Sequence, residues 1–359
     1  TFSEVKDDAL EFDRVDVFND WAHRFLFERI IAPEGGHGLI ANAYHIKVTV
    51  RDDDTFWLSS GNWKMSSSQP LITQTQRDEA TRKDLPGNRE WHVVIRNKKL
   101  ADRFRAHILQ DFQRSKDLGG DTLPKRLRDE TFVDVPLEEA VTLERPAPRG
   151  ILKPKTLKVR AKVRLLLTPD REGEVYSEAV LTLIRSARTS LLFQIPYISI
   201  SPNPSVDRGY IDALIQALVD KLITLEDARV ILRSGGKEFS SPQHVAWFLK
   251  SKGVDISRQL RVIEDHHTKG MIVDGRRLLL GSHNWSGPGV TLNRDASLII
   301  EAREAAEYYA EAFEIDWERA SPVKARKFVR RTTAVREAVG ESPPAGFQRI
   351  RLADWLKDE

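Results

Sequence analysis

The chain has no cysteine, and its 359 residues contain no long apolar run. Without cysteine, disulfides, thiolate metal sites and cysteine nucleophiles are all excluded. Apolar runs such as Leu165–Leu167 and Leu278–Leu280 fall far short of the roughly 20 residues that a membrane-spanning helix needs. The N-terminal segment is acidic and lacks the apolar stretch of a signal peptide. We therefore expect a cytoplasmic protein without a membrane span.

Charge of either sign is not in large excess. Lys and Arg number 56 against 53 Asp and Glu, which gives a net charge of +3, and the isoelectric point is about 8.9. Hydrophobic residues make up 40% and charged residues 30%, which is ordinary globular composition and excludes a disordered or fibrous chain. The length predicts two domains. The mildly basic balance is compatible with a polyanionic partner.

Two segments repeat one pattern of polar residues, from position 45 to position 267, an offset of 222 residues. The pattern consists of His45, Lys47, Asp52, Ser60 and Asn62 in the first copy, and of His267, Lys269, Asp274, Ser282 and Asn284 in the second. Trp63 and Trp285 follow at the same offset. Further on, Asn88-Arg89-Glu90 corresponds to Asn293-Arg294-Asp295, and each copy ends in a stretch with helical spacing, over 100–112 and 302–317. The chain is therefore two copies of one unit.

Strands and helices are predicted to alternate through the second copy. The predicted strands cover 157–167, 191–195, 228–233, 260–262, 267–273, 277–281 and 296–301, and the predicted helices cover 177–188, 206–225 and 242–252. This alternation is typical of an α/β sheet with helices on both faces.

The repeat also divides the chain. We expect a first unit over residues 1–120, a linker over 121–155 that contains five prolines, a second unit over 156–320 and a tail over 321–359 that is basic at first. Only 44 residues precede His45, so the first unit apparently lacks the N-terminal strands and helices of the second. We interpret the chain as a fragment or processed form of a longer protein. The alternative is a first copy that is naturally reduced.

The repeated residue types suit chemistry at a phosphodiester. Such a reaction needs a nucleophile for phosphorus, an acid for the leaving oxygen and positive charge or donors for the non-bridging oxygens. One imidazole can be the nucleophile and a second the acid, while Lys and Asn bind phosphate oxygens. His and Lys at positions i and i+2 of a strand point to one face, so His45 and Lys47 can share a site, as can His267 and Lys269. Only two copies facing each other across a pseudo-twofold hold both a nucleophile and an acid.

Both segments resemble the signature of the phospholipase D superfamily, His-x-Lys, four residues, Asp, six residues, Gly-Ser-x-Asn. The second copy matches fully, with Gly281 included, whereas the first has Ser59 in place of that Gly. The resemblance covers roughly 18–112 and 157–318 and excludes the linker and the tail. It implies two α/β/α sandwich units packed as a pseudo-twofold dimer within one chain, and therefore a monomer with one shared site.

The resemblance also implies a metal-independent, two-step mechanism through a phosphohistidine, with no cofactor. It assigns His45 as nucleophile, His267 as acid and base, and Lys47, Lys269, Asn62 and Asn284 as phosphate ligands. The carboxylates that orient the imidazoles fall on Glu90 and Asp295. The supporting residues implied are Asp52 and Asp274 for the motif itself, and Ser60 and Ser282 for the phosphate pocket.

The substrate stays open between nucleic acid and phospholipid. A strand with alternating basic residues favours a phosphate backbone as ligand, although a solvated edge strand explains the same pattern; these residues are Lys158, Arg160, Lys162 and Arg164. The insertion over 64–87 directly follows the first motif, where a loop can cover a substrate and set its choice, although plain loop variation explains it as well. We favour a nuclease acting on DNA or RNA. The alternatives are a phospholipase D or phosphatidyl transferase, and a phosphate-binding module without catalysis, which the intact motif pair argues against.

Overall fold

The computed structural model describes residues 43–62, 88–116, 132–136, 154–170, 173–200, 208–236, 238–264 and 266–328, with backbone alone at 112–116 and 132–136. Several predictions of the sequence lie outside these residues. These predictions concern the expected lack of N-terminal elements in the first unit, Trp63, the insertion over 64–87 and the tail from residue 329 onward.

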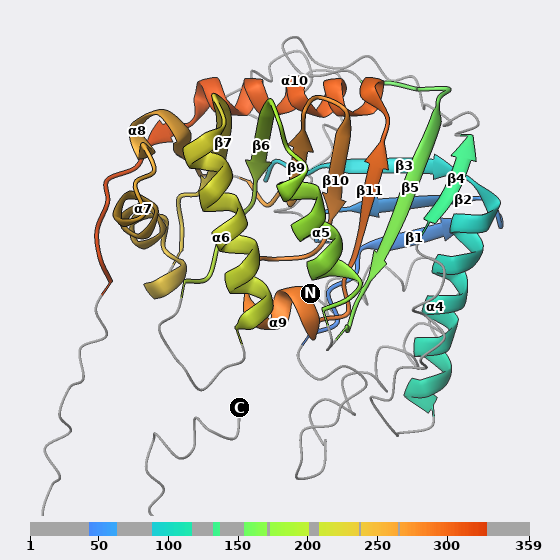
Figure 1. Cartoon of the computed structure of the whole chain (residues 1–359). Coiled ribbons are helices and arrows are strands. Elements are labelled where there is room, and N and C mark those ends of the chain that lie inside the picture. Colours follow the sequence, from blue (N-terminus) through green and yellow to red (C-terminus); the bar gives the residue numbers. More distant parts are fainter. Residues whose placement is uncertain are drawn as a thin grey trace, which may run out of the picture. The chain divides into compact units, whose positions relative to one another are not determined.

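Most described strands belong to one mixed sheet of nine, in the order β12-β8-β7-β6-β9-β10-β11-β5-β4 (Figure 1). In chain order these strands are β4 (Phe132–Pro136), β5 (Arg160–Leu167), β6 (Ser190–Gln194), β7 (Asp227–Arg233), β8 (Leu260–Ile263), β9 (Gly270–Val273), β10 (Arg277–Gly281), β11 (Ala296–Glu301) and β12 (Ser321–Pro322). β6, β7 and β8 are parallel neighbours, whereas β9, β10 and β11 form an antiparallel meander. The α/β class that the sequence predicts is confirmed.

Helices cover both faces of this sheet. The described helices of the second copy are α5 (Tyr176–Arg185), α6 (Gly209–Thr224), α7 (Pro242–Ser251), α8 (Ile256–Gln259), α9 (Gly287–Thr291) and α10 (Arg303–Arg319), with a 3-10 turn at Glu238–Ser240. α5 and α6 pack against one face, and α10 packs against the other (Figure 1). Because both faces are covered, β9 is buried along its whole length and reads as a continuous apolar run instead of an alternating one.

The described part of the first copy forms a separate sheet, β1 (Val48–Arg51), β2 (Thr55–Ser59) and β3 (His92–Arg96), followed by α4 (Lys98–Lys116). Its strands keep the register of the second copy. Val48 pairs with Leu58 as Gly270 pairs with Leu280, and Thr55 pairs with Arg96 as Arg277 pairs with Glu301. The sequence repeat is thus a repeat of structure.

The two copies share a hydrophobic core. Phe56, Leu58 and Phe104 of the first copy belong to the same buried cluster as Phe313 and Trp317 of α10. Burial of these large side chains holds the small sheet against the face of the large sheet that α10 covers. This packing sets the distance between the two motif copies.

Part of the predicted linker forms a strand. Residues 132–136 make up β4, which pairs antiparallel with β5 and takes the edge of the large sheet. β5 therefore lies between β11 and β4 and is not an edge strand, so the explanation of its charges as protection of an exposed edge does not apply.

Candidate active site

The two His-x-Lys segments meet where the copies face each other. His45 N donates to Arg294 O at 2.8 Å, and His267 N donates to Arg89 O at 2.9 Å. Parallel bridges join Tyr44 to Arg294 and His266 to Arg89. Each histidine is therefore held by the backbone of the other copy. The two imidazole rings lie 6.4 Å apart, centroid to centroid.

Each imidazole also faces a carboxylate from the opposite copy. His45 Nδ1 makes a 2.8 Å hydrogen bond with Asp295 Oδ1, and His267 Nδ1 lies 3.2 Å from Glu90 Oε1. A serine then fixes each carboxylate, because Ser60 Oγ donates to Glu90 Oε2 at 2.6 Å and Ser282 Oγ donates to Asp295 Oδ1. The predicted carboxylates are thus beside the imidazoles, while both serines contact carboxylates.

The two lysines are buried beside the histidines. Lys47 Nζ donates to His45 O at 2.5 Å, and Lys269 Nζ donates to His267 O at 2.8 Å and Ser60 O at 3.1 Å. Lys269 Nζ also lies 2.8 Å from the ring nitrogens of His267. Two cationic side chains therefore converge on the space between the imidazoles.

Burial and mutual repulsion lower the pKa values of these bases. Burial is the main cause at both histidines, and at His267 the neighbouring Lys269 and Lys47 lower the pKa further. Burial lowers the pKa of Lys47 to about 8 and lowers that of Lys269 well below its usual value. A nearby anion favours the protonated form of such bases, so a bound phosphate would raise these pKa values.

The two carboxylates differ. Burial alone would raise the pKa of Asp295, but the adjacent His45 lowers it below its usual range. At Glu90 burial dominates and raises the pKa, although Lys269 and Ser60 act in the opposite direction. Asp295 is therefore a firmly ionised partner for His45, whereas Glu90 holds its charge less strongly beside His267.

Of the remaining motif residues, the two asparagines follow the strands that lead to this centre, whereas the two aspartates lie at the hairpin turns at the opposite ends of those strands. Asn62 and Asn284 follow β2 and β10, and the buried Asn284 Oδ1 has no hydrogen-bond partner in the part of the chain that the structure describes. Asp274 accepts from the backbone N–H groups of 188, 189 and 190 and pairs with Arg277, so it fixes the turn after β9. Asp52 lies at the equivalent turn with a positive φ and is exposed.

The departure of Ser59 from the family pattern has a steric explanation. A Cβ at Gly281 would lie 2.3 Å from Ala296 O and 2.2 Å from Ser297 Oγ, so only glycine fits there. In the first copy the buried Ser59 pairs in register with His92, and its Oγ accepts from Gly61 N at 2.8 Å. The first copy thus has room for the serine side chain, whereas at the equivalent position of the second copy Ala296 and Ser297 leave no room for a side chain.

Two ion pairs between the copies, each with a buried aspartate, were not identified from the sequence. Arg89 Nε donates to Asp316 Oδ1 at 3.0 Å, and Arg294 Nη2 donates to Asp111 Oδ1 at 2.6 Å. Arg89 and Arg294 occupy equivalent positions, as do Asp111 and Asp316. Because the carbonyls of the same arginines hold His267 and His45, each pair anchors one histidine. The repeated Arg of the Asn-Arg-Glu and Asn-Arg-Asp segments was the available signal.

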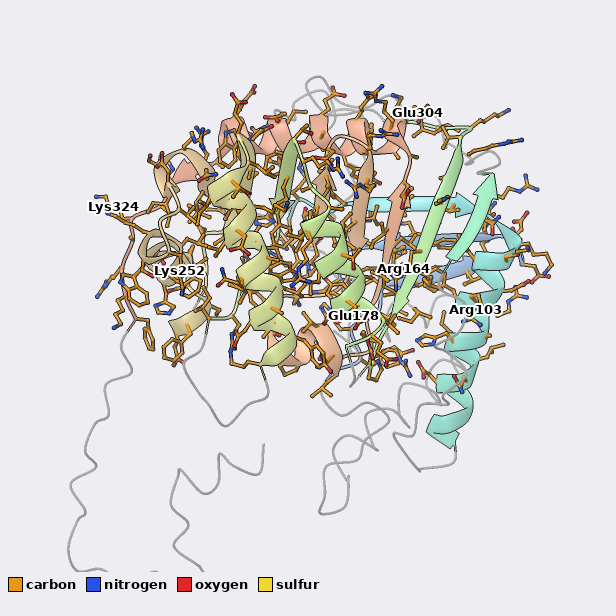
Figure 2. The ribbon with its side chains drawn as sticks, viewed as in Figure 1. Arg103, Arg164, Glu178, Lys252, Glu304 and Lys324 are labelled. Carbon is orange, nitrogen blue, oxygen red and sulfur yellow. The ribbon has the colours of Figure 1, made fainter. Side chains whose placement is uncertain are left out.

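The basic face of β5 lies away from the imidazoles. Leu167, at one end of β5, pairs with Ala296 next to Asp295, whereas Lys162 pairs with Glu301 at the other end of β11. Lys158, Arg160 and Lys162 are exposed there. Arg164 faces the α5 side of the sheet, where burial lowers its pKa and Glu178 of α5 partly offsets this effect (Figure 2).

The described residues contain neither a cluster of metal ligands nor a membrane-spanning helix. Among the described residues, no three His, Asp or Glu side chains converge in a way that could hold a metal ion. In the same part of the chain, no helix is both long and apolar enough to cross a bilayer. The cytoplasmic location stays a prediction.

Comparison with known proteins gives matches to part of the chain. Residues 180–317 match the family model described as cardiolipin synthase, PLD-like domain. The mitochondrial cardiolipin hydrolase of Homo sapiens is 41% identical over 90 residues, and that of Canis lupus familiaris is 33% identical over 85 residues. These alignments cover 25% and 24% of this chain, and 34% and 33% of the two relatives. The chain thus spans about a third of the length of the curated relatives it matches.

Solved structures with a related chain trace include Nuc from Salmonella typhimurium, a phospholipase D family member, with 21% identity and a TM-score of 0.36. That match covers 46% of this chain and all of Nuc. Phosphatidylserine synthase from Haemophilus influenzae has 14% identity and a TM-score of 0.49, over 79% of this chain and 63% of the synthase. On the family match and the curated relatives, residues 180–317 are similar to the PLD-like domain of the phospholipase D superfamily, and the paired motifs extend this resemblance to the first copy.

Proposed function

We propose that the chain is a phosphodiesterase that uses both copies of the motif in one site. The observation that carries this proposal is the pair of imidazoles 6.4 Å apart, each beside a carboxylate of the opposite copy and a buried lysine. A tetrahedral phosphate fits between two rings at this separation, with the lysines and asparagines as ligands of its non-bridging oxygens. One chain then holds a complete site and acts as a monomer.

His45 is the nucleophile in this mechanism. Its Nδ1–H donates to Asp295, which leaves the Nε2 lone pair free to attack phosphorus. As the N–P bond forms, the bond to the leaving oxygen breaks, and the protonated His267 donates its proton to that oxygen. In the second step neutral His267 takes a proton from water, the water oxygen attacks phosphorus, and the N–P bond breaks to regenerate His45.

Binding of an anionic substrate allows His267 to take up a proton from solvent. Burial and then the two lysines lower the pKa of this imidazole. A phosphodiester anion between the rings offsets that repulsion and raises the pKa of the imidazole. The acid is thus charged when the substrate is in place.

Nucleic acid is the substrate class that the surface favours. Large apolar side chains that are exposed among the described residues are scattered over separate elements, at Val94, Leu109 and Ile223. Membrane-docking enzymes present clustered apolar and aromatic side chains instead. The exposed basic residues of β5 suit a phosphate backbone. A nuclease acting on DNA or RNA is therefore the first candidate.

A phospholipase D activity on phospholipid is the second candidate, and the names of the curated relatives favour it. The deciding experiment is incubation of the purified chain in EDTA with single-stranded DNA, duplex DNA, RNA and cardiolipin-containing vesicles, each with the His267→Asn variant in parallel. We expect strand cleavage by the wild type that the variant lacks. Hydrolysis of vesicle lipid without strand cleavage would assign the second candidate. No hydrolysis of any substrate, including bis(p-nitrophenyl) phosphate, would overturn the proposed activity.

A further inference from the structure

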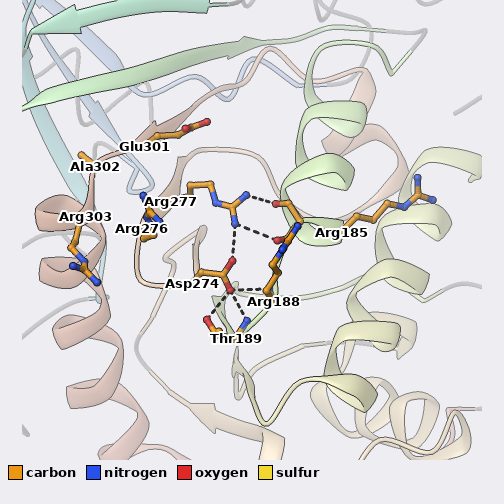
Figure 3. A pocket seen from close by; sticks show the side chains of 10 residues that line it. Arg185, Arg188, Thr189, Asp274, Arg276, Arg277, Glu301, Ala302 and Arg303 are labelled. Atoms are coloured by element: carbon orange, nitrogen blue, oxygen red, sulfur yellow. Dashed lines mark hydrogen bonds and ion pairs between the residues drawn. The ribbon is translucent and has the colours of Figure 1, made fainter.

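An arginine-lined pocket opens at the end of the second copy's sheet that is remote from the imidazoles. Its volume is about 840 Å³, and it lies between the end of α5, the β9–β10 turn and the start of α10 (Figure 3). Five arginines line it, namely Arg185, Arg188, Arg276, Arg277 and Arg303, against two carboxylates, Asp274 and Glu301. The mechanism proposed above uses none of these arginines.

The carboxylate in the middle of this pocket is fully engaged. Asp274 Oδ1 accepts from three backbone N–H groups and Thr189 Oγ1, while Oδ2 pairs with Arg277. These hydrogen bonds overcome the effect of burial and lower the pKa of Asp274 to about 2. Arg277 is committed as well, because it also donates to Ser186. The Asp274 carboxylate therefore stabilises the turn, and both of its oxygens already have partners within the protein.

The other arginines remain at the rim. Arg185, Arg188, Arg276 and Arg303 are exposed, and Arg185 extends away from the rest (Figure 3). Arg303 makes a 3.4 Å ion pair with Glu307, but both side chains are largely exposed, so this pair is weak. The pocket thus presents cationic groups that its own carboxylates do not neutralise.

Comparison with the first copy shows that the fold does not require these charges. The positions of Gly275, Arg276 and Arg277 correspond to Asp53, Asp54 and Thr55, so the same turn is acidic in the first copy. There Asp53 pairs with Arg105, and Asp54 pairs with Arg96 at 2.7 Å. Only the second copy places arginines at this turn. Arg277 stabilises it through Asp274 and Ser186, whereas the exposed Arg276 is placed for a role other than stabilising the hairpin.

The basic surface extends beyond the pocket. Glu301 in its wall pairs in register with Lys162 of β5, and Arg160 lies two residues further along on the same face. Both side chains are exposed. A backbone that carries regularly spaced charges can therefore contact several cations along one path.

We propose that this arginine pocket binds the phosphate backbone of a nucleic acid strand whose scissile bond lies between His45 and His267. This inference rests on the proposed nuclease function. The five residues of β10 separate Arg277 from Ser282 by roughly 17 Å at about 3.4 Å per residue. A duplex strand carries one phosphate per about 3.4 Å of its axis, so on a duplex the pocket engages a phosphate about five nucleotides or more from the cleaved bond. A more extended single strand covers the same distance with fewer nucleotides.

The test removes two exposed arginines that are outside the catalytic centre. Arg188→Ala/Arg276→Ala is compared with Lys250→Ala/Arg258→Ala, which removes the same charge from exposed positions of α7 and α8. Binding of a 30-nucleotide single strand is measured by fluorescence anisotropy between 50 and 200 mM salt, in a His267→Asn background that prevents cleavage. Hydrolysis of bis(p-nitrophenyl) phosphate is measured with His267 intact.

We expect the pocket variant to bind the strand more weakly than the control variant. Loss of two phosphate contacts lowers the slope of log K against log salt by about 1.4 for single strands. Hydrolysis of the small substrate stays at the wild-type rate. Equal slopes for the two variants would overturn the pocket assignment, as would weakened binding to cardiolipin vesicles with unchanged binding to the strand. Absence of hydrolysis in the wild type would instead contradict the proposed activity.

Discussion

Asp295 Oδ1 lies 2.8 Å from His45 Nδ1, although 250 positions separate the two residues and they belong to different copies of the repeat. Glu90 stands in the same relation to His267, with the roles of the copies exchanged. Each copy therefore supplies the imidazole of one pair and the carboxylate of the other. Neither copy alone places a histidine beside its own carboxylate, so the mechanism that we propose needs both motifs in one site.

Replacement of Asp295 should disable His45 without removing it. Asp295→Asn keeps the shape of the side chain but lowers the charge that orients Nδ1–H and stabilises the imidazolium. We expect kcat to fall by about 10²–10⁴-fold, the usual contribution of an oriented acid–base group. The measurement is the steady-state hydrolysis of bis(p-nitrophenyl) phosphate, with the exposed Asp220→Asn as the matched control. A kcat within twofold of the control would exclude Asp295 from the mechanism.

The pKa of Lys47 predicts how substrate binding depends on pH. Burial lowers this pKa to about 8, so the side chain is an ammonium below pH 8 and an amine above it. Because a phosphodiester stays anionic throughout, its affinity should fall about tenfold per pH unit above that value. Binding in the His267→Asn background between pH 6.5 and 9.5 provides the measurement.

Lys47→Arg serves as the control for that pH profile, since a guanidinium stays charged over the whole range. The decline above pH 8 should be less steep in this variant, because only Lys269 still loses its charge there. An affinity of the His267→Asn protein with Lys47 intact that is flat up to pH 9.5 would contradict the assignment of Lys47 as a charged phosphate ligand.

The buried ion pair between Arg294 and Asp111 should contribute strongly to stability. Both side chains are almost fully buried, and the pair joins α4 of the first copy to the segment that holds His45. Removal of one partner leaves an unpaired buried charge, so Asp111→Ala should lower the free energy of unfolding by about 3–5 kcal/mol. Urea denaturation measures this loss.

The exposed pair between Arg96 and Asp54 is the natural comparison. Asp54→Ala should lower the free energy of unfolding far less than Asp111→Ala does, because solvent screens the exposed pair. Equal effects of the two substitutions would show that the Arg294–Asp111 pair does not hold the copies together.

The sequence predicts the repeat and the main elements because periodicity is strong where burial is continuous. β10 and β11 fall at the predicted residues, and α5, β7 and α10 begin within one residue of prediction. β4 was missed because it has only five residues and lies in a proline-rich stretch without a sustained period. Its partner β5 is 24 residues further on, and single-sequence patterns do not report such pairing.

The motif also predicts which residues gather at the site. It does not predict which copy supplies the carboxylate beside each histidine. Nothing in the spacing of Glu90 or Asp295 indicates that each faces the histidine of the other copy. That exchange depends on the packing of two sheets through a shared core. Arg89 and Arg294 were visible as a repeat, yet their partners Asp316 and Asp111 lie in helices where an acidic residue normally indicates a solvated face.

The central claim is that the two copies form one site, and the kinetics of the single variants His45→Asn and His267→Asn test it most directly. With saturating bis(p-nitrophenyl) phosphate in EDTA, each variant should lose essentially all turnover. One variant lacks the nucleophile and the other lacks the general acid and base. An equimolar mixture of the two should remain inactive, because each monomer keeps only one histidine. If either variant keeps about half of the wild-type kcat, the copies act independently and the shared site is contradicted.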